Sequence, residues 1–203
     1  MLRINQITCP IDHTERQLFS ALCRKLNCNK EDILSWRIAR RSLDARKKPE
    51  LFYSYTLLAR CKNEEKLLKK LSRDKDIGKD TSVPFCFRTT GKKALTKRPV
   101  IIGTGPAGLF CGLELAKAGF RPILLERGRD VEQRSADVEA FWKGAPLLAN
   151  SNVQFGEGGA GTFSDGKLNT LVKDKYGRNT HVLETFVAFG AKESILYDQK
   201  PHL

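Results

Sequence analysis

A glycine-rich turn between two short apolar runs is the feature that most constrains how this chain of 203 residues can fold. Residues 100–102 suit a strand that is buried on both faces, and they lead directly into the sequence GTGPAG at 103–108. Apolar residues at helical spacing follow and end near Gly119, and a second apolar run at 121–125 ends at Glu126. This order of strand, glycine turn, helix and strand predicts a Rossmann-type β-α-β unit that binds a dinucleotide.

Each glycine of the turn has its own expected role. Gly103 permits the tight turn, Gly105 lets the backbone approach a pyrophosphate, and Gly108 lets the helix pack closely on the strand. The helix N-terminus then offers N–H groups and the positive end of its dipole to the phosphates. Glu126 stands where a carboxylate accepts hydrogen bonds from ribose hydroxyls, and its charge disfavours the 2′-phosphate of NADP. The motif leaves FAD and NAD open, and an ordinary β-α-β unit with a glycine-rich turn is the alternative to both.

A second glycine-rich segment follows a predicted helix at 130–142. Five glycines lie between residues 156 and 166, beside Phe155 and Phe163. A loop with little side-chain bulk and many free N–H groups can approach a large flat ligand or its phosphates. A flexible surface loop is the alternative, but it would leave both phenylalanines exposed to water. We therefore expect this segment to face a ligand.

The two glycine motifs resemble those of a family of bacterial NAD(P)/FAD-dependent oxidoreductases, the uncharacterised FAD-dependent dehydrogenases. The first motif, together with Gly112, Gly119 and Glu126, matches the long dinucleotide fingerprint of flavoproteins, and the second matches over 155–168. The resemblance spans essentially the whole chain, because those proteins place a small domain before the FAD domain. It implies FAD as the cofactor, with NAD(P)H as an electron donor that would not bind at the first motif.

The resemblance also implies which residues hold the cofactor. The residues that would contact the pyrophosphate, the adenosine ribose or the flavin are Gly103, Gly105, Ala107, Gly108, Glu126, Gly158, Gly159, Ala160, Gly161 and Ser164. Arg127 and Arg134 would lie near the phosphates or the adenine. Catalytic residues and the substrate stay unassigned; Asp165 and Lys167 are the polar candidates on the second loop, and His181 is expected to be an ordinary helix residue.

Residues 1–88 are predicted to form a separate domain of the α/β chain. The expected elements are a strand at 2–5, a helix at 13–26 capped by Asp12 and Glu15, strands at 35–43 and 51–58, a helix that begins at 63–65, and an edge strand at 83–87. This β-α-β-β-α-β order is typical of the ferredoxin-like fold, which hosts many functions and so names none. Residues 89–98 are expected to be a linker, and 99–203 the truncated N-terminal part of an FAD-binding Rossmann-type domain.

Positive charge is concentrated in the first half of the chain. Residues 1–97 carry 23 Lys and Arg against 11 Asp and Glu, and the whole chain has a formal net charge of +13. The basic stretch 37–48 allows a second hypothesis, a nucleic-acid-binding or nucleotide-binding module, because Tyr53 and Tyr55 follow it on a predicted strand as in RNA-recognition motifs. The glycine of the RNA-binding pattern is missing, however, and Leu51 stands where a basic residue belongs. A solvated basic face or a docking surface is the simpler interpretation.

Several absences narrow the expectations further. A Cys-x-x-Cys pair is missing and the chain has 3 His, so we expect no metal site; the second loop also lacks the cysteines of disulfide reductases. No apolar run of ~18 residues and no leader pattern occurs, so we expect a cytoplasmic protein that does not cross a membrane. A helix at 178–190 and a strand at 194–197 are predicted, but nothing after Lys173 resembles the late Gly-Asp motif or the further strands of flavoproteins. We therefore expect the N-terminal part of a longer protein, inactive alone or completed by a complementing chain.

Overall fold

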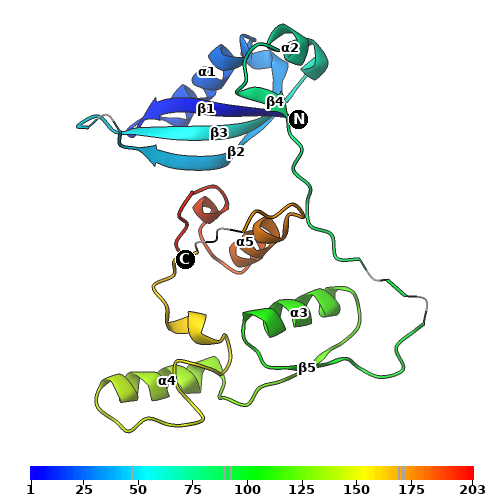
Figure 1. The fold of residues 1–203 in the computed structure, drawn as a ribbon, viewed down its shortest axis with the longest axis vertical. Helices are drawn as coiled ribbons and strands as arrows, with labels where there is room; N and C mark the ends of the chain where they lie inside the picture. Colours follow the sequence, from blue (N-terminus) through cyan, green and yellow to red (C-terminus); the bar gives the residue numbers. More distant parts are fainter. Residues whose placement is uncertain (47, 89, 92, 169, 171) are drawn as a thin grey trace. The chain divides into compact units, whose positions relative to one another are not determined.

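Two β-sheets, four-stranded and two-stranded, organise the described residues of this computed structural model, which are 1–46, 48–88, 90–91, 93–168, 170 and 172–203 (Figure 1). Contacts divide the chain into two units: unit 1 comprises Met1–Phe85 with Lys167–Leu203, and unit 2 comprises Cys86–Gly166. The fold is mixed α/β. The expected boundaries at 89–98 stay a prediction; in the structure the segment 167–203, expected with the second domain, groups with the first 85 residues.

The sheet of unit 1 is antiparallel throughout, with the strand order β2-β3-β1-β4. Its elements, in chain order, are β1 (Leu2–Pro10), α1 (Glu15–Leu26), β2 (Ile33–Asp44), β3 (Phe52–Cys61), α2 (Glu64–Lys70) and β4 (Ile77–Lys79). The β-α-β-β-α-β order expected from the sequence is therefore present. Figure 1 shows α1 and α2 on one side of this sheet.

Side chains that point alternately to the two faces of the sheet produce the core of unit 1. Alternate residues of β1 and β3 face the helices, and Leu18, Leu22 and Leu26 of α1, spaced four residues apart, are buried against them. Thr56 and Leu58 lie between these positions on β3 and are buried as well. The centre of β3 is thus covered on both faces.

The N-terminal cap of α1 differs from expectation. The cap of α1 is Thr14, whose Oγ accepts from Gln17 N at 3.3 Å while Gln17 Oε1 accepts from Thr14 N at 2.7 Å, so the box at Asp12 and Glu15 was wrong. Both pairs have the three-residue spacing of a capping box, and the turn after β1 decides between them.

The last strand of the sheet is also displaced. Ile77 pairs with Ile4, and β4 ends at Lys79, whereas 83–87 forms no strand. The residues just after α2 are close enough in the chain to reach the edge of β1 first. The predicted strand at 194–197 was likewise wrong, since a 3-10 helix, η3, spans Glu193–Leu196.

Unit 2 begins with two parallel strands joined by a helix. Its elements are β5 (Val100–Ile102), α3 (Pro106–Lys117), β6 (Ile123–Leu125), α4 (Val131–Trp142) and the 3-10 helix η2 (Ala160–Phe163). The segment that returns to unit 1 carries α5 (Arg178–Ala188) and η3. In the part of the chain that the structure describes, no helix has the length and apolar character needed to cross a bilayer.

Leu57→Ala is expected to lower the free energy of unfolding of unit 1 by about 2–5 kcal/mol, because it removes a fully buried side chain and leaves a cavity. Urea unfolding followed by circular dichroism measures the change. Leu34→Ala is the control, since that side chain is 58% exposed. Equal losses in the two variants would contradict the placement of the core.

Candidate functional site

The first glycine motif forms the turn between β5 and α3. Gly103 has a φ of +97°, a left-handed conformation that favours glycine. A Cβ on Gly108 would collide with the carbonyl oxygen of Gly103, and one on Gly112 would lie 3.1 Å from the Leu124 side chain. The absence of side chains at these two positions is what lets α3 lie close against β5 and β6.

Gly105, like Gly103, has nothing around it on the side where a Cβ would point. A Cβ there would meet no heavy atom of the described chain within 4 Å. Gly105 is also the N-cap of α3 and cannot supply a side-chain cap, and Pro106 occupies the first helical position. The N-terminus of a 12-residue helix therefore opens onto free space at this turn.

The second glycine-rich loop packs directly onto this turn. Gly158 N donates to the Thr104 carbonyl at 2.9 Å, and a Cβ on Gly159 would lie 3.3 Å from the Cα of Gly105. The two motifs, some fifty residues apart in the chain, thus meet within unit 2. Sequence patterns predicted that each motif faces a ligand but contained no sign of this hydrogen bond.

Glu126 ties the turn to the end of β6. Its Oε2 accepts from Thr104 N at 2.7 Å and from Thr104 Oγ1 at 3.0 Å, and its Oε1 accepts from Gly128 N at 2.8 Å. These hydrogen bonds, chiefly those from the backbone of Gly128 and Thr104, hold the pKa of the carboxyl below its ordinary value. Ribose recognition by this carboxylate stays a prediction; the structure shows that the carboxylate organises the turn.

Arg134 organises the second loop from inside. The side chain is fully buried; its Nε donates to the Asn152 carbonyl at 2.9 Å, and its Nη1 donates to the Glu157 and Gly159 carbonyls at 2.7 and 2.9 Å. Its Nη2 has no partner among the described residues. Burial lowers the pKa of this guanidinium, although an arginine stays protonated at neutral pH. One buried donor group therefore remains available in the loop.

Glu157 completes the attachment of the loop. Its Oε2 accepts from Val131 N, the first residue of α4, at 2.8 Å, and its backbone N donates to the Arg129 carbonyl at 3.2 Å. The sequence patterns do not predict a special role for Glu157 or Thr104. An acidic residue inside a glycine-rich loop was the only available signal, because the partners of both residues lie far away in the chain.

The remaining predicted site residues are more dispersed. Arg127 stacks on Phe155, with 4.1 Å between the guanidinium carbon and the ring centroid. Ala160 and Gly161 belong to η2, and the hydroxyl of Ser164 accepts from Gly166 N at 3.2 Å. Lys167 forms an isolated bridge with His202 in unit 1. The structure therefore gathers the two glycine motifs with Glu126 and Arg134, while the assignment of ligand contacts stays a prediction.

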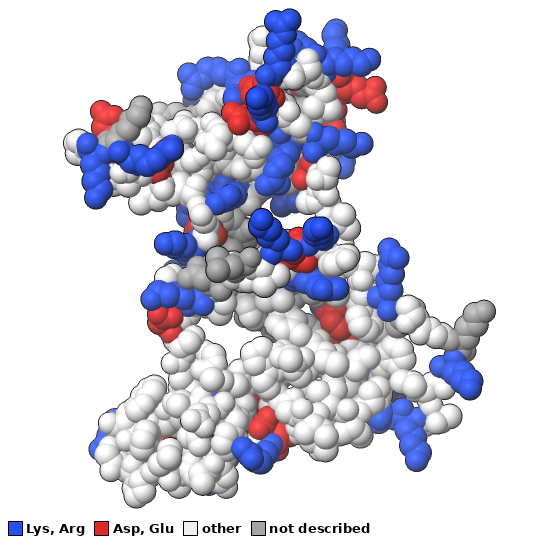
Figure 2. Space-filling model, in the orientation of Figure 1, with Lys and Arg blue, Asp and Glu red and all other residues white. Residues whose placement is uncertain are grey.

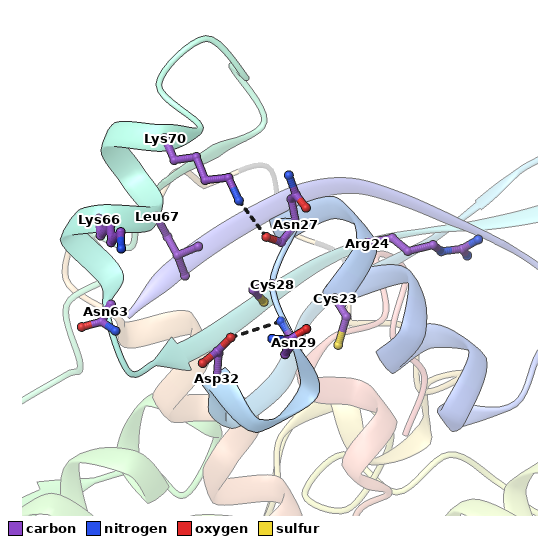
Figure 3. Close-up of a pocket in the computed structure, with 10 residues that line it drawn as sticks. All are labelled: Cys23, Arg24, Asn27, Cys28, Asn29, Asp32, Asn63, Lys66, Leu67 and Lys70. Atoms are coloured by element: carbon purple, nitrogen blue, oxygen red, sulfur yellow. Dashed lines mark hydrogen bonds between the residues drawn. The ribbon is translucent and has the colours of Figure 1, made fainter.

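A separate pocket of about 640 Å³ lies between α1 and α2 of unit 1 (Figure 3). Two of its basic residues, Arg24 and Lys70, stand in the last turns of these helices, where positive charge offsets the helix dipole, and Lys70 Nζ donates to the Asn27 carbonyl at 3.0 Å. Burial raises the pKa of the Cys23 and Cys28 thiols, which disfavours the reactive thiolate. The positions of these two basic residues and the burial of the two thiols therefore have a structural explanation.

Arg134→Lys is expected to loosen the second loop, because an ammonium cannot reproduce the planar fork that binds three carbonyls. Losing hydrogen bonds from a charged group costs about 1.5–3 kcal/mol, so amide exchange in residues 152–159 is expected to accelerate about tenfold or more. Hydrogen exchange by mass spectrometry measures this. Arg129→Lys is the control, since that arginine is exposed and pairs with Asp137 at 3.0 Å; equal acceleration there would contradict the role of Arg134.

Glu126→Gln is expected to reduce the loss of folding stability that unit 2 shows as the pH falls. The folded state lowers the pKa of Glu126, so its stabilisation is present above the unfolded value of about 4.3 and is lost as pH falls through the folded value. Urea midpoints measured between about pH 6 and about pH 3 report the slope. An unchanged slope in Glu126→Gln, or the same change in the exposed control Glu132→Gln, would argue against the assignment.

Two family models match parts of the chain, and a relative matches its full length. Residues 98–138 match the model of an FAD binding domain, and residues 1–60 match a domain of unknown function, DUF8436. An uncharacterized protein of Clostridium beijerinckii is 44% identical over 202 residues; the similarity covers 100% of this chain and 37% of the relative. The chain thus spans little more than a third of that protein. The FAD-binding match covers the glycine turn, α3 and Glu126, and it supports a flavin-binding function of the oxidoreductase type.

Proposed function

We propose that this chain binds FAD through the two glycine-rich segments of unit 2 and forms the first part of an FAD-dependent dehydrogenase. The observation that carries the proposal is the convergence of the segments: the second loop lies against the turn at Gly105, beside the open N-terminus of α3. A helix N-terminus next to glycine backbone is suited to a pyrophosphate. The match of residues 98–138 to an FAD binding domain supports FAD over NAD.

The residues present fit such a cofactor. The open space at Gly105 would accept phosphate oxygens, and the unpaired Nη2 of Arg134 would supply a charged donor from inside the loop. Gly103, Ala107 and Gly108 would complete the phosphate side. Gly158, Gly159, Ala160, Gly161 and Ser164 would lie along the flavin, and Arg127 near the phosphates or the adenine.

The chemistry would belong to the cofactor, because a flavin accepts and donates electrons when bound, while the protein positions it. Glu126 would hold the adenosine ribose with the lone pairs that Thr104 and Gly128 leave free. Arg134 would keep the loop closed on the turn. NAD(P)H would serve as the electron donor at another site.

The proposal extends to the whole protein. The order of β5, α3 and β6 supports the first portion of a Rossmann-type domain, and the strand order of unit 1 supports a ferredoxin-like fold. The relative from Clostridium beijerinckii is much longer than this chain. We infer that further strands, supplied by a continuation or by a complementing chain, complete the flavin domain.

RNA binding by the basic unit receives less support from the sheet. An RNA-recognition motif stacks bases on aromatic rings that lie on the open face of its sheet. Tyr55 instead faces α1, is 3% exposed, and has its hydroxyl 3.1 Å from His13 Nε2. Tyr53 packs against the same core.

Gly105→Val is expected to reduce FAD affinity at least a hundredfold. Gly105 has a φ of −69° and a ψ of 179°, which any residue adopts, so the added side chain fills the ligand space without straining the turn. Fluorescence titration of FAD measures the affinity, and flavin absorbance after gel filtration checks retention.

Gly78→Val is the matched control, because a Cβ there also meets nothing within 4 Å and the residue lies in β4 of unit 1. The control is expected to bind FAD as the unmodified chain does. FAD retention by Gly105→Val, or failure of the unmodified chain to bind FAD, would overturn the proposal.

A further inference from the structure

A cavity of about 980 Å³ lies within unit 1, between the sheet and the segment that returns from unit 2. Arg3 and Arg40 line it from the strands, and Lys173 and Lys200 line it from the returning segment. The FAD proposal does not use this cavity. Figure 2 shows that Lys and Arg dominate the charged surface on the face that it displays.

The returning segment is attached to the sheet beside this cavity. Arg41 N donates to the Tyr197 carbonyl at 2.6 Å, and Gln199 N donates to the Arg41 carbonyl at 3.0 Å. The guanidinium of Arg41 donates two hydrogen bonds to the carboxylate of Asp198, at 2.7 and 2.9 Å. Residues 197–199 therefore extend the edge of β2 by a short parallel bridge, and this wall of the cavity is held in place.

The charge inside the cavity is strongly unbalanced. Asp198 is the one acidic residue among the described lining residues, and Arg41 already neutralises it. Arg3 has a loose pair with Asp80 at 3.7 Å. In the described ranges no carboxylate pairs with Arg40, Lys173 or Lys200. Unpaired cations around one cavity create a positive potential that an anion relieves.

The rest of the lining limits the kind of anion. Leu183, Ile195 and Leu196 provide an apolar wall, and Asn179 and Gln199 provide amide groups. A volume near 1,000 Å³ with apolar walls and a few polar groups is typical of sites for small molecules. The cavity thus combines a surface for a ring system with a set of cations.

We propose that this cavity binds a phosphorylated small molecule of the nucleoside diphosphate class. Arg40, Lys173 and Lys200 contact its phosphates, and the apolar wall contacts its base. Because the lining comes from both the sheet and the returning segment, the ligand lies between two walls rather than along an open face. The proposal is independent of FAD binding in unit 2.

Isothermal titration of the full chain with ADP and with inorganic pyrophosphate tests the proposal. The charge-reversal pair Arg40→Glu with Lys200→Glu is expected to weaken both ligands about tenfold or more, as loss of charge-assisted hydrogen bonds requires. Arg40→Gln with Lys200→Gln, which removes charge without reversing it, is expected to weaken them to a smaller extent. Thermal unfolding verifies that both pairs fold.

Two controls separate this cavity from other anion sites. Arg16→Glu with Arg73→Glu makes the same change in net charge at exposed residues outside the lining, and it is expected to leave the affinity unchanged. The same titration in Gly105→Val removes the proposed pyrophosphate site of unit 2, and the binding described here is expected to persist.

Four results would overturn the proposal. They are an absence of ADP and pyrophosphate binding in the unmodified chain, equal weakening in the exposed-charge control, complete loss of binding in Gly105→Val, and no effect of the Arg40 and Lys200 variants. A single-stranded RNA that binds more tightly than ADP and depends on Arg40 and Lys200 would replace the small molecule with a nucleic acid. ADP binding with weaker pyrophosphate binding would support recognition of the base as well as the phosphates.

Discussion

The arrangement of unit 2 depends on one buried guanidinium. Arg134 binds three backbone carbonyls of the second loop, where water would otherwise have to satisfy them. Space for the arginine comes from missing side chains: a Cβ on Gly156 would lie 2.8 Å from Arg134 Cδ. Glycine enrichment in this loop therefore serves two purposes, the packing of a charged side chain inside the protein and the close approach to the turn at Gly105. Composition alone could not separate these purposes.

Local patterns explain which parts of the fold could be predicted. The β5-α3-β6 unit has its strands, glycine turn and helix in one continuous stretch, so short-range rules suffice. The errors have a different origin. Thr14 rather than Asp12 caps α1, because two overlapping motifs have the spacing of a capping box. Residues Ile77–Lys79 rather than 83–87 form the edge strand, because they are the first segment after α2 that can reach the edge of β1. The contacts of Arg134 and Glu157 join residues up to 26 positions apart, and no local rule reports them.

The two units use charge in different ways. In unit 2 the important charges are few and bound to backbone groups, as Glu126 and Arg134 are, and they shape loops. In unit 1 many cations lie at the surface, and Arg40, Lys173 and Lys200 surround a cavity with one neutralised carboxylate. The formal charge of +13 thus combines charged residues with different roles in the two units, and the total says little about any single site.

The course of the chain gives the Arg41–Asp198 pair a further importance. Unit 2 is inserted between two pieces of unit 1, and the pair connects residues 157 positions apart. A ribosome must release the chain as far as Gln199 before β2 can meet its partner, so that edge of the N-terminal sheet stays uncovered while the intervening residues are synthesised. The entropic cost of closing a loop grows only slowly with its length, on the order of 0.6 kcal/mol per doubling. The long separation therefore delays the pairing in time but adds little thermodynamic cost. Until residues 197–199 pair with it, the exposed edge of β2 is open to binding by chaperones or neighbouring chains.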